Sequence, residues 1–237
     1  MKLGFGTICT VIGVAFAATS ALSAQTVTYT GSGTNPGTGS GLAAQVTLTL
    51  NAGVLGIDLI NTGAPGKADS DALCALLFTL APGNTLTPLT ASLLPGSVYT
   101  NPPAFSIGQE WGYNAGFSGP AGTNAGVSAA GLGLFGSGNF AANGQHLQGL
   151  DYGLINGIAA NANGPMQAAV LVNNGVHLDL AAPTLKLSDI SNVRFQYGTA
   201  LTDSNLPGTP PVPEPGTLSL LATAVLSAVP FLRKRVR

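Results

Sequence analysis

The sequence predicts an all-β domain, an antiparallel sandwich or jelly roll, and three observations lead to this prediction. Apolar and polar residues alternate along many short segments, which is the pattern of a half-buried strand. Turns rich in glycine, proline and asparagine separate these segments. Few segments show a helical period. Short strands divided by such turns are typical of sandwiches and jelly rolls.

Composition excludes several functions before any motif is considered. Only 7% of the 237 residues are charged, against about 25% in an ordinary soluble domain. The net charge of −1 gives no electrostatic basis for binding nucleic acid. Gly131 to Gly136 has the glycine spacing of a dinucleotide-binding loop, but the glycine and asparagine residues that follow interrupt the helix that such a loop requires. We therefore expect no cofactor.

Residues 1–24 have the three parts of a secretory signal peptide. Lys2 supplies the positive charge, an apolar helix follows, and small residues up to Ala24 provide the cleavage site. Signal peptidase is thus an expected partner. Because Cys9 leaves with this segment, Cys74 remains alone and cannot form an internal disulfide.

The strands of the expected domain, residues 25–206, begin with one at Val27 and Tyr29. Segments 46–50 and 55–59 then alternate apolar and polar residues on either side of Asn51, Ala52 and Gly53. This pattern predicts a hairpin with a three-residue loop.

A continuously apolar segment, Leu73 to Leu80, follows the hairpin. Such a run predicts a strand buried on both faces, with Cys74 as a small buried hydrophobe. The next long stretch, residues 112–149, is rich in glycine, alanine and asparagine, and we expect loops there with a strand at Val127 to Leu134.

A second hairpin is predicted near the end of the domain. Ala168 to Val172 forms one strand, residues 173–175 form the turn, and Val176 to Leu180 returns, with His177 and Asp179 facing outward. The final strand follows from three alternating apolar residues, Val193, Phe195 and Tyr197.

Several residues are candidates for a site in the domain, each with a structural alternative. Asp69 and Asp71 have the spacing of two calcium ligands, although solvated loop charges are favoured. His146 with Asp151, or His177 with Asp179, would suit a hydrolase, but a surface polar pair is the usual outcome. Two sets of residues suggest a binding face instead. Trp111, Tyr113 and Phe117 could form an aromatic platform for a sugar, although core packing is the alternative. Thr47 and Thr49 could form a threonine array for ice, although they are also ordinary strand residues.

The C-terminal segment, residues 212–237, has three parts that follow a linker at residues 207–211. The first is the triplet Pro213, Glu214 and Pro215, which prolines keep extended. An apolar run follows, long enough for a helix of about 24 Å, which is marginal for crossing a membrane. The last part is a basic cluster that would stay in the cytoplasm, comprising Arg233, Lys234, Arg235 and Arg237.

These three parts, in this order, resemble the PEP-CTERM sorting signal of Gram-negative bacteria, also named the ice-binding protein C-terminal domain. In that family an exosortase, a membrane protease, recognises the signal, so the resemblance implies that Pro213, Glu214 and Pro215 are the recognition residues. The domain also loosely resembles the ectodomains of exosortase-dependent surface proteins at residues 56–63, 72–80, 150–154 and 191–201. The family is associated with exopolysaccharide and biofilm.

The expected function is that of an exported, non-enzymatic surface or matrix protein. The chain would be anchored transiently in the inner membrane by its C-terminal helix, processed by the exosortase, and released to the cell surface or beyond. Its partner there would be exopolysaccharide. Two alternatives stay open: a secreted hydrolase or lyase acting on polysaccharide, and a sugar- or ice-binding module.

Overall fold

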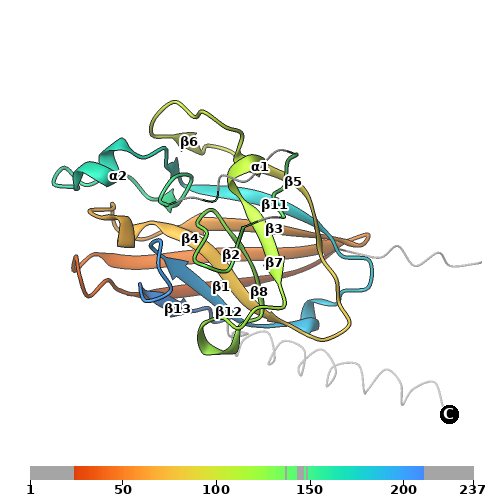
Figure 1. The fold of residues 1–237 in the computed structure, drawn as a ribbon. Helices are drawn as coiled ribbons and strands as arrows, with labels where there is room; N and C mark the ends of the chain where they lie inside the picture. The colour runs from red at the N-terminus through yellow and green to blue at the C-terminus, as the bar shows by residue number, and fades with distance from the viewer. Residues whose placement is uncertain (1–23, 137, 143–146, 148, 211–237) are drawn as a thin grey trace, which may run out of the picture.

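The structure, a computed structural model, describes residues 24–136, 138–142, 147 and 149–210. Most of its regular elements are strands, which form two sheets (Figure 1). The first sheet is antiparallel throughout and has the order β1-β2-β3-β11-β5. Its strands are β1 (Gln25–Thr34), β2 (Gly41–Asn51), β3 (Val54–Asn61), β5 (Thr87–Leu93) and β11 (Gly175–Ala181).

The second sheet has the order β13-β12-β4-β9-β10-β6, with β8 pairing both β4 and β7. Its β9 and β10 run parallel, so this sheet is mixed. Its strands are β4 (Leu73–Leu80), β6 (Val98–Tyr99), β7 (Gly112–Ala115), β8 (Ala125–Ser128), β9 (Leu154–Ile155), β10 (Val172–Asn173), β12 (Ile190–Tyr197) and β13 (Asn205–Pro207).

Helical elements are few and short in the described residues. They are the α-helices α1 (Ile107–Glu110) and α2 (Gly164–Ala168) and the 3₁₀ turns Asp69–Asp71, Pro120–Gly122 and Leu187–Asp189. The prediction of an all-β domain is therefore confirmed. The helices predicted for the two ends of the chain lie outside the described residues.

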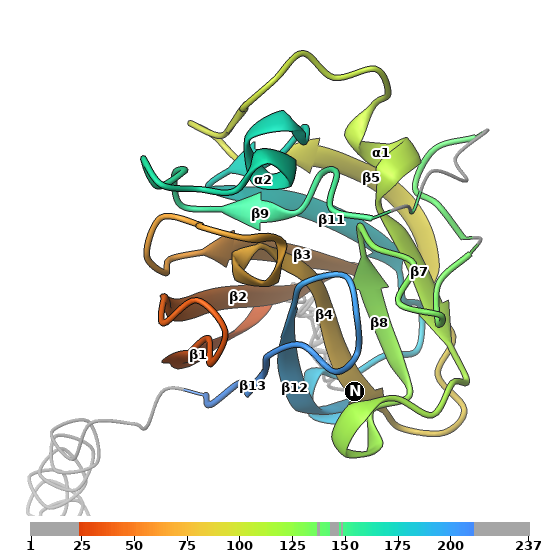
Figure 2. The same ribbon diagram turned by 60° about the vertical axis from the view of Figure 1, so that its left-hand side comes forward.

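The main core lies between the two sheets (Figure 2). Leu48, Ile57 and Leu178 of the first sheet and Phe78 and Phe195 of the second all belong to it and are almost fully buried. They come from alternate positions of their strands, because successive side chains of a strand point to opposite faces.

Strand β4 is buried on both faces, as its continuous apolar sequence predicts. Leu76 and Phe78 face the main core, while Cys74 and Leu77 belong to a second, smaller core. Side chains from the long segment between β8 and β10, such as Leu171, cover this second core. Burial raises the pKa of Cys74 to about 12, so this thiol is a packed hydrophobe, as predicted.

The first predicted hairpin is present, with a tighter turn than expected. Asn51 pairs with Val54, so the loop has two residues and not three. Ala52 and Gly53 both have positive φ angles, 48° and 77°, as a type I′ turn requires. The pattern predicted both strands correctly, but it did not predict the last pair of the ladder, between Asn51 and Val54.

The second predicted hairpin is wrong. Residues 164–168 form α2, capped by Asn163 Oδ1, which accepts a hydrogen bond from the Met166 backbone N–H at 3.0 Å. The strand before the turn, β10, belongs to the second sheet, while β11 belongs to the first. Asn174, with a φ of 93°, turns the chain from one sheet to the other. The outward direction of His177 and Asp179 is nevertheless correct.

The strand predicted at Val127 to Leu134 is only partly present. It corresponds to β8, which ends at Ser128. The chain then turns at Leu132 and Gly133, whose φ angles of 51° and 68° are incompatible with a strand reaching Leu134. Strand β7 pairs with β8 in a short hairpin.

The described part of the expected linker, residues 207–210, contacts both sheets. Gly208 donates a backbone hydrogen bond to Val193 O, and Thr209 exchanges two with Thr30 of β1. The predicted signal peptide (save its last residue), the Pro213, Glu214 and Pro215 triplet and the terminal basic cluster lie outside the described residues. In the described part of the chain no helix has the length and apolar character needed to cross a bilayer.

Candidate binding face

The side of the first sheet that points away from the core is polar, and we call it the outer face. It follows from alternation: β2, β3 and β11 each bury every second side chain and leave the residues between them partly exposed. In β1, Val27 and Tyr29 pack against the core, and the threonines between them lie on the other side. The outer face includes the side chains of Thr26, Thr28, Thr30, Ser32, Ala43, Gln45, Thr47, Thr49, Asp58, Thr62, Thr90, His177 and Asp179.

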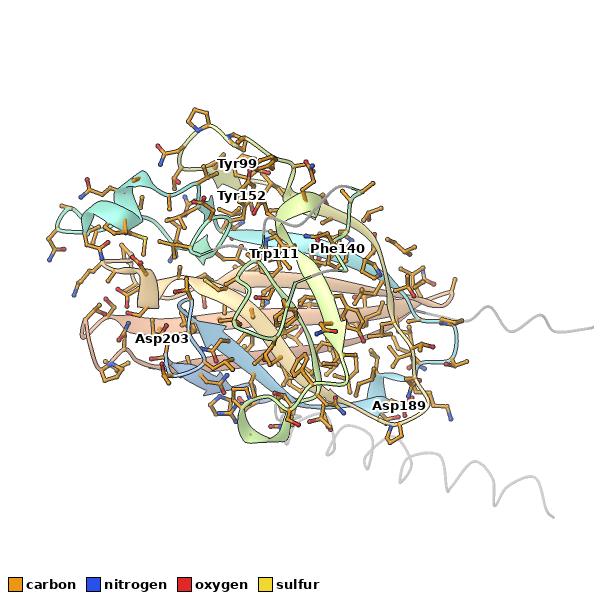
Figure 3. The ribbon with its side chains drawn as sticks, viewed as in Figure 1. Tyr99, Trp111, Phe140, Tyr152, Asp189 and Asp203 are labelled. Carbon is orange, nitrogen blue, oxygen red and sulfur yellow. The ribbon has the colours of Figure 1, made fainter. Side chains whose placement is uncertain are left out.

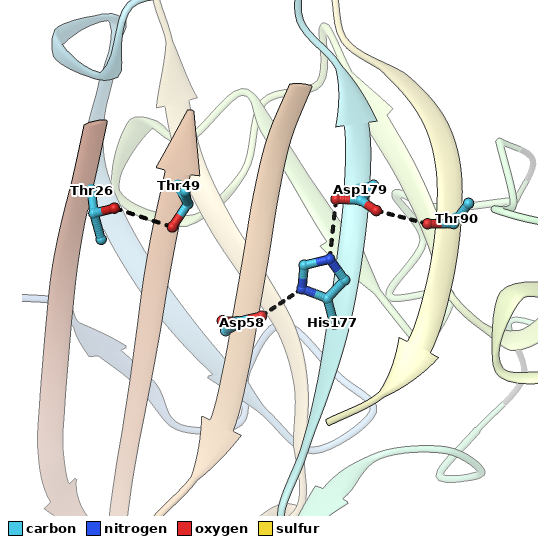
Figure 4. Close-up of polar contacts among 6 residues, drawn as sticks. All are labelled: Thr26, Thr49, Asp58, Thr90, His177 and Asp179. Atoms are coloured by element: carbon cyan, nitrogen blue, oxygen red, sulfur yellow. Dashed lines mark hydrogen bonds and ion pairs between the residues drawn. The ribbon is translucent and has the colours of Figure 1, made fainter. Parts of the chain in front are cut away.

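A histidine held between two carboxylates lies on β11, beside the edge strand β5 of the outer face (Figure 4). His177 lies opposite Asp58 in the β3–β11 register, and its Nδ1 is 2.5 Å from Asp58 Oδ1. Its Nε2 is 3.1 Å from Asp179 Oδ1, two residues along the same strand. Thr90 of β5 donates a hydrogen bond of 2.8 Å to the other oxygen of Asp179. The network therefore joins three adjacent strands.

This network favours a charged imidazole. Partial burial alone lowers the pKa of His177, but the hydrogen bond from its ring to Asp58 and the charge of Asp179 outweigh burial and raise it above 6.5. Both ring nitrogens have carboxylate partners, so neither is free to accept a proton from a substrate. The group serves better as an electrostatic link between strands than as a general base.

Two threonine pairs extend the outer face to its edge. Thr28 and Thr47 hydroxyls lie 3.1 Å apart, and those of Thr26 and Thr49 lie 3.3 Å apart. Each pair joins β1 to β2, in the register that places Thr47 beside Asp58. Because these hydroxyls bond to each other, part of their hydrogen-bonding capacity is already used.

A groove of about 330 Å³ lies at one end of the outer face, beside the last described residues. Four of its polar side chains, Thr30, Ser32, Gln45 and Thr62, have no hydrogen-bond partner within the part of the chain that the structure describes. The complete lining is Thr30, Gly31, Ser32, Ala43, Ala44, Gln45, Thr62, Pro207 and Thr209. The groove thus offers uncharged donors and acceptors that point to solvent.

Glycine in β1 allows the wall of this groove to form. A Cβ atom at Gly31 would lie 2.7 Å from the Phe195 ring and 2.9 Å from Pro207 O, both too close. With glycine there, residues 206–208 approach the strand, and Thr209 closes the end of the groove through its hydrogen bonds to Thr30.

The predicted calcium pair does not converge on a common position. Asp71 is 2% exposed, and its oxygens accept hydrogen bonds from Thr38, Asn35, Ser40 and the Lys67 and Ala68 backbone. Burial alone would raise the pKa of Asp71, but these hydrogen bonds lower it below its usual value. Asp69 instead lies 3.5 Å from the Asn163 amide. Asp71 therefore has a structural role: it ties the β1–β2 connection to the turn before β4.

The aromatic residues considered as a sugar platform pack against the two cores, Trp111 and Tyr113 buried and Phe117 partly buried. Trp111 is fully buried, and its Nε1 donates to Tyr152 O at 3.3 Å (Figure 3). Tyr113 belongs to the same core, and the Phe117 ring packs edge-to-face on Phe135. His146, predicted as a partner of Asp151, lies outside the described residues.

Glu110 is a buried carboxyl group that the sequence patterns did not single out. It is 2% exposed at the end of α1, and no hydrogen bond reaches its carboxyl group from the described residues. Burial, with a smaller contribution from Asp151, raises the pKa of Glu110 to about 7. Asp151 itself accepts a hydrogen bond from the Val170 backbone.

Comparisons with protein-family models, with curated proteins and with solved structures find no match to this chain. Within the described ranges, no group of three or more His, Cys, Asp or Glu side chains could hold a metal ion. The outer face and its groove are therefore interpreted from their own chemistry.

We expect an elevated pKa for His177 that depends on Asp58. In an NMR titration of the two histidines of the chain, with His177→Gln used for assignment, the His177 signals should titrate above pH 6.5. Asp58→Asn removes the closest partner and should lower that pKa, and Asp179→Asn should lower it less. The raised pKa of His177 stabilises the fold fully below about pH 6.5. This contribution is lost as the pH rises through the pKa that His177 has in the folded protein. An unchanged titration in Asp58→Asn would contradict the network.

Glu110 should make the fold less stable as pH rises. Below pH 4.5 its carboxyl is protonated in both states, but between pH 4.5 and about 7 only the unfolded chain ionises. Glu110→Gln should therefore raise the free energy of unfolding by about 3 kcal/mol at pH 8 and have little effect at pH 4. Urea unfolding followed by Trp111 fluorescence measures the free energy of unfolding at both pH values. An equal effect of the substitution at pH 4 and pH 8 would show that ionisation of Glu110 is not its cause.

Proposed function

We propose that this chain is an exported surface or matrix protein whose β-sandwich domain binds polysaccharide through the outer face. Both ends of the sequence support export: a signal peptide at residues 1–24 and a tail that resembles a PEP-CTERM signal at residues 212–237. On this proposal, signal peptidase and an exosortase process the chain, and exopolysaccharide is its partner.

The observation that carries the binding role is the groove at the end of the outer face. Its size, about 330 Å³, is at the lower end of the range for small-molecule sites, so it would hold one or two sugar units of a longer polymer. Its unpartnered groups, the side chains of Thr30, Ser32, Gln45 and Thr62, match the hydroxyls of a neutral sugar. The open outer face beyond it gives a polymer room to continue.

The arrangement favours binding over polysaccharide cleavage. A glycoside hydrolase needs two carboxyl groups on either side of a sugar, one of them free to donate a proton. On the outer face Asp58 and Asp179 are both engaged by His177. Glu110 has a suitable pKa but is buried, and its neighbour Asp151 is bonded to the backbone.

Ice is the second ligand that the outer face suggests, because paired threonines such as Thr28 and Thr47 form a regular hydroxyl array. The adjoining Asp58, His177 and Asp179 interrupt that array with charged groups. We therefore favour a sugar polymer as the ligand.

Affinity electrophoresis in gels that contain dextran, or exopolysaccharide from the producing strain, tests the binding role. The double variant Gln45→Ala with Thr62→Val removes side-chain hydrogen bonds in the groove and should weaken retardation about tenfold, since two such bonds are worth about 1.4 kcal/mol or more. The matched control, Gln25→Ala with Thr87→Val, changes the same residue types outside the groove and should behave as wild type.

Two results would contradict this proposal. Equal retardation of the groove variant and the control would place any binding elsewhere, and no retardation by either polymer would remove the polysaccharide role. Shortening of the polymer during incubation would instead support the hydrolase or lyase alternative.

A further inference from the structure

Strand β1 differs from the other edge strands of the two sheets. It has ten residues, no charged side chain and no proline. The opposite edge strand of the first sheet, β5, carries Pro88 and pairs through a bulge. The second sheet has edge strands of two, three and four residues, at β6, β13 and β7. Short strands, prolines and bulges protect an edge from further pairing, and β1 has none of them.

The free backbone groups of β1 can be assigned from one pair of hydrogen bonds. Thr30 N–H donates to Thr209 O at 3.0 Å, and Thr209 N–H donates to Thr30 O at 2.8 Å, away from β2. Residues two apart in a strand direct their backbone groups the same way. Thr26 and Thr28 therefore also point their N–H and C=O groups away from β2, and no partner for them lies in the described part of the chain.

The sequence of the chain's own tail does not favour a continuation of this pairing. The Thr30–Thr209 pair fixes an antiparallel register in which Thr28 would face Pro211 and Thr26 would face Pro213. Proline has no N–H to donate at either position. A continuation of this register would therefore lack a backbone N–H at both positions, and within the described residues the ladder beside residues 25–29 of β1 is open.

We propose that this open edge pairs with the same edge of a second copy of the chain. An antiparallel pairing centred on Val27 places Thr26 opposite the partner's Thr28, and Thr28 opposite the partner's Thr26. In both pairs the backbone groups face each other and exchange two hydrogen bonds. The pairing is self-complementary, as a two-fold interface requires, and the Thr30–Thr209 pair limits it to residues 25–29.

The dimer joins two five-stranded sheets into one. The half-buried Val27 side chains meet across the axis on the core side, and the threonines of the two copies become neighbours on the outer face. The interface is smaller than the roughly 1,200 Å² of a stable complex, so the isolated dimer is weak. This pairing requires no ligand and stands apart from the polysaccharide proposal.

Disulfide trapping in the full-length chain, solubilised in a mild detergent, tests this pairing. In a Cys9→Ala background the remaining native thiol, Cys74, is fully buried. Val27→Cys places two thiols on residues whose Cα atoms are about 4.5 Å apart across the axis, within disulfide range. Mild oxidation should give a covalent dimer. Gln25→Cys, whose two copies lie about 13 Å apart in this register, should not.

Variants of the edge complete the test. Adding Thr28→Pro to Val27→Cys removes an outward N–H and should reduce trapping at least fivefold. The control, Thr34→Pro added to Val27→Cys, changes the same edge outside residues 25–29 and should not reduce trapping. If Thr28→Pro loses the native fluorescence of Trp111, the double variant Thr26→Lys with Thr28→Lys replaces it. Absence of trapping at Val27, equal trapping at Gln25, or trapping that survives the edge variants would overturn the proposal.

Discussion

The alternation of side chains along four adjacent antiparallel strands is the constraint on which the rest of the structure depends. Because β1, β2, β3 and β11 are in continuous register, the inward residues of each strand lie in the core or, in β1, pack against it, and the others form one surface. A shift of one residue in β3 or β11 would bury Asp58 or His177 and expose leucines. The same ladder that builds the core therefore builds the outer face.

Local contacts at the ends of the strands shape this face further. Asp71 holds the β1–β2 connection through its buried carboxylate, and Thr209 binds the edge of β1 next to the groove. Gly31 is needed because the chain that forms the groove wall passes against its backbone. The site is thus made by segments far apart in the sequence, with little charge, which suits a role in recognition rather than chemistry.

Sequence patterns predicted what depends on neighbouring residues. The β2–β3 hairpin, the buried strand β4 and the outward direction of His177 follow from period-two alternation. The same patterns failed where the outcome depends on distant contacts. Residues 168–172 have the pattern of one arm of a hairpin, but α2 extends to Ala168 and Asn174 directs the chain to the other sheet. The pairing of His177 with Asp58, 119 residues away, gave no local signal.

The proposed function combines binding by the outer face with export signals at the two ends of the sequence. Its central claim is that the chain is exported and cleaved at both ends. The intact mass of the protein from native cells tests that claim most directly, with and without the exosortase gene. The account predicts a mass that lacks the first 21 to 24 residues and the segment after the Pro213, Glu214 and Pro215 triplet, with this C-terminal segment retained when the exosortase is deleted. A protein with both termini intact in both strains would contradict it.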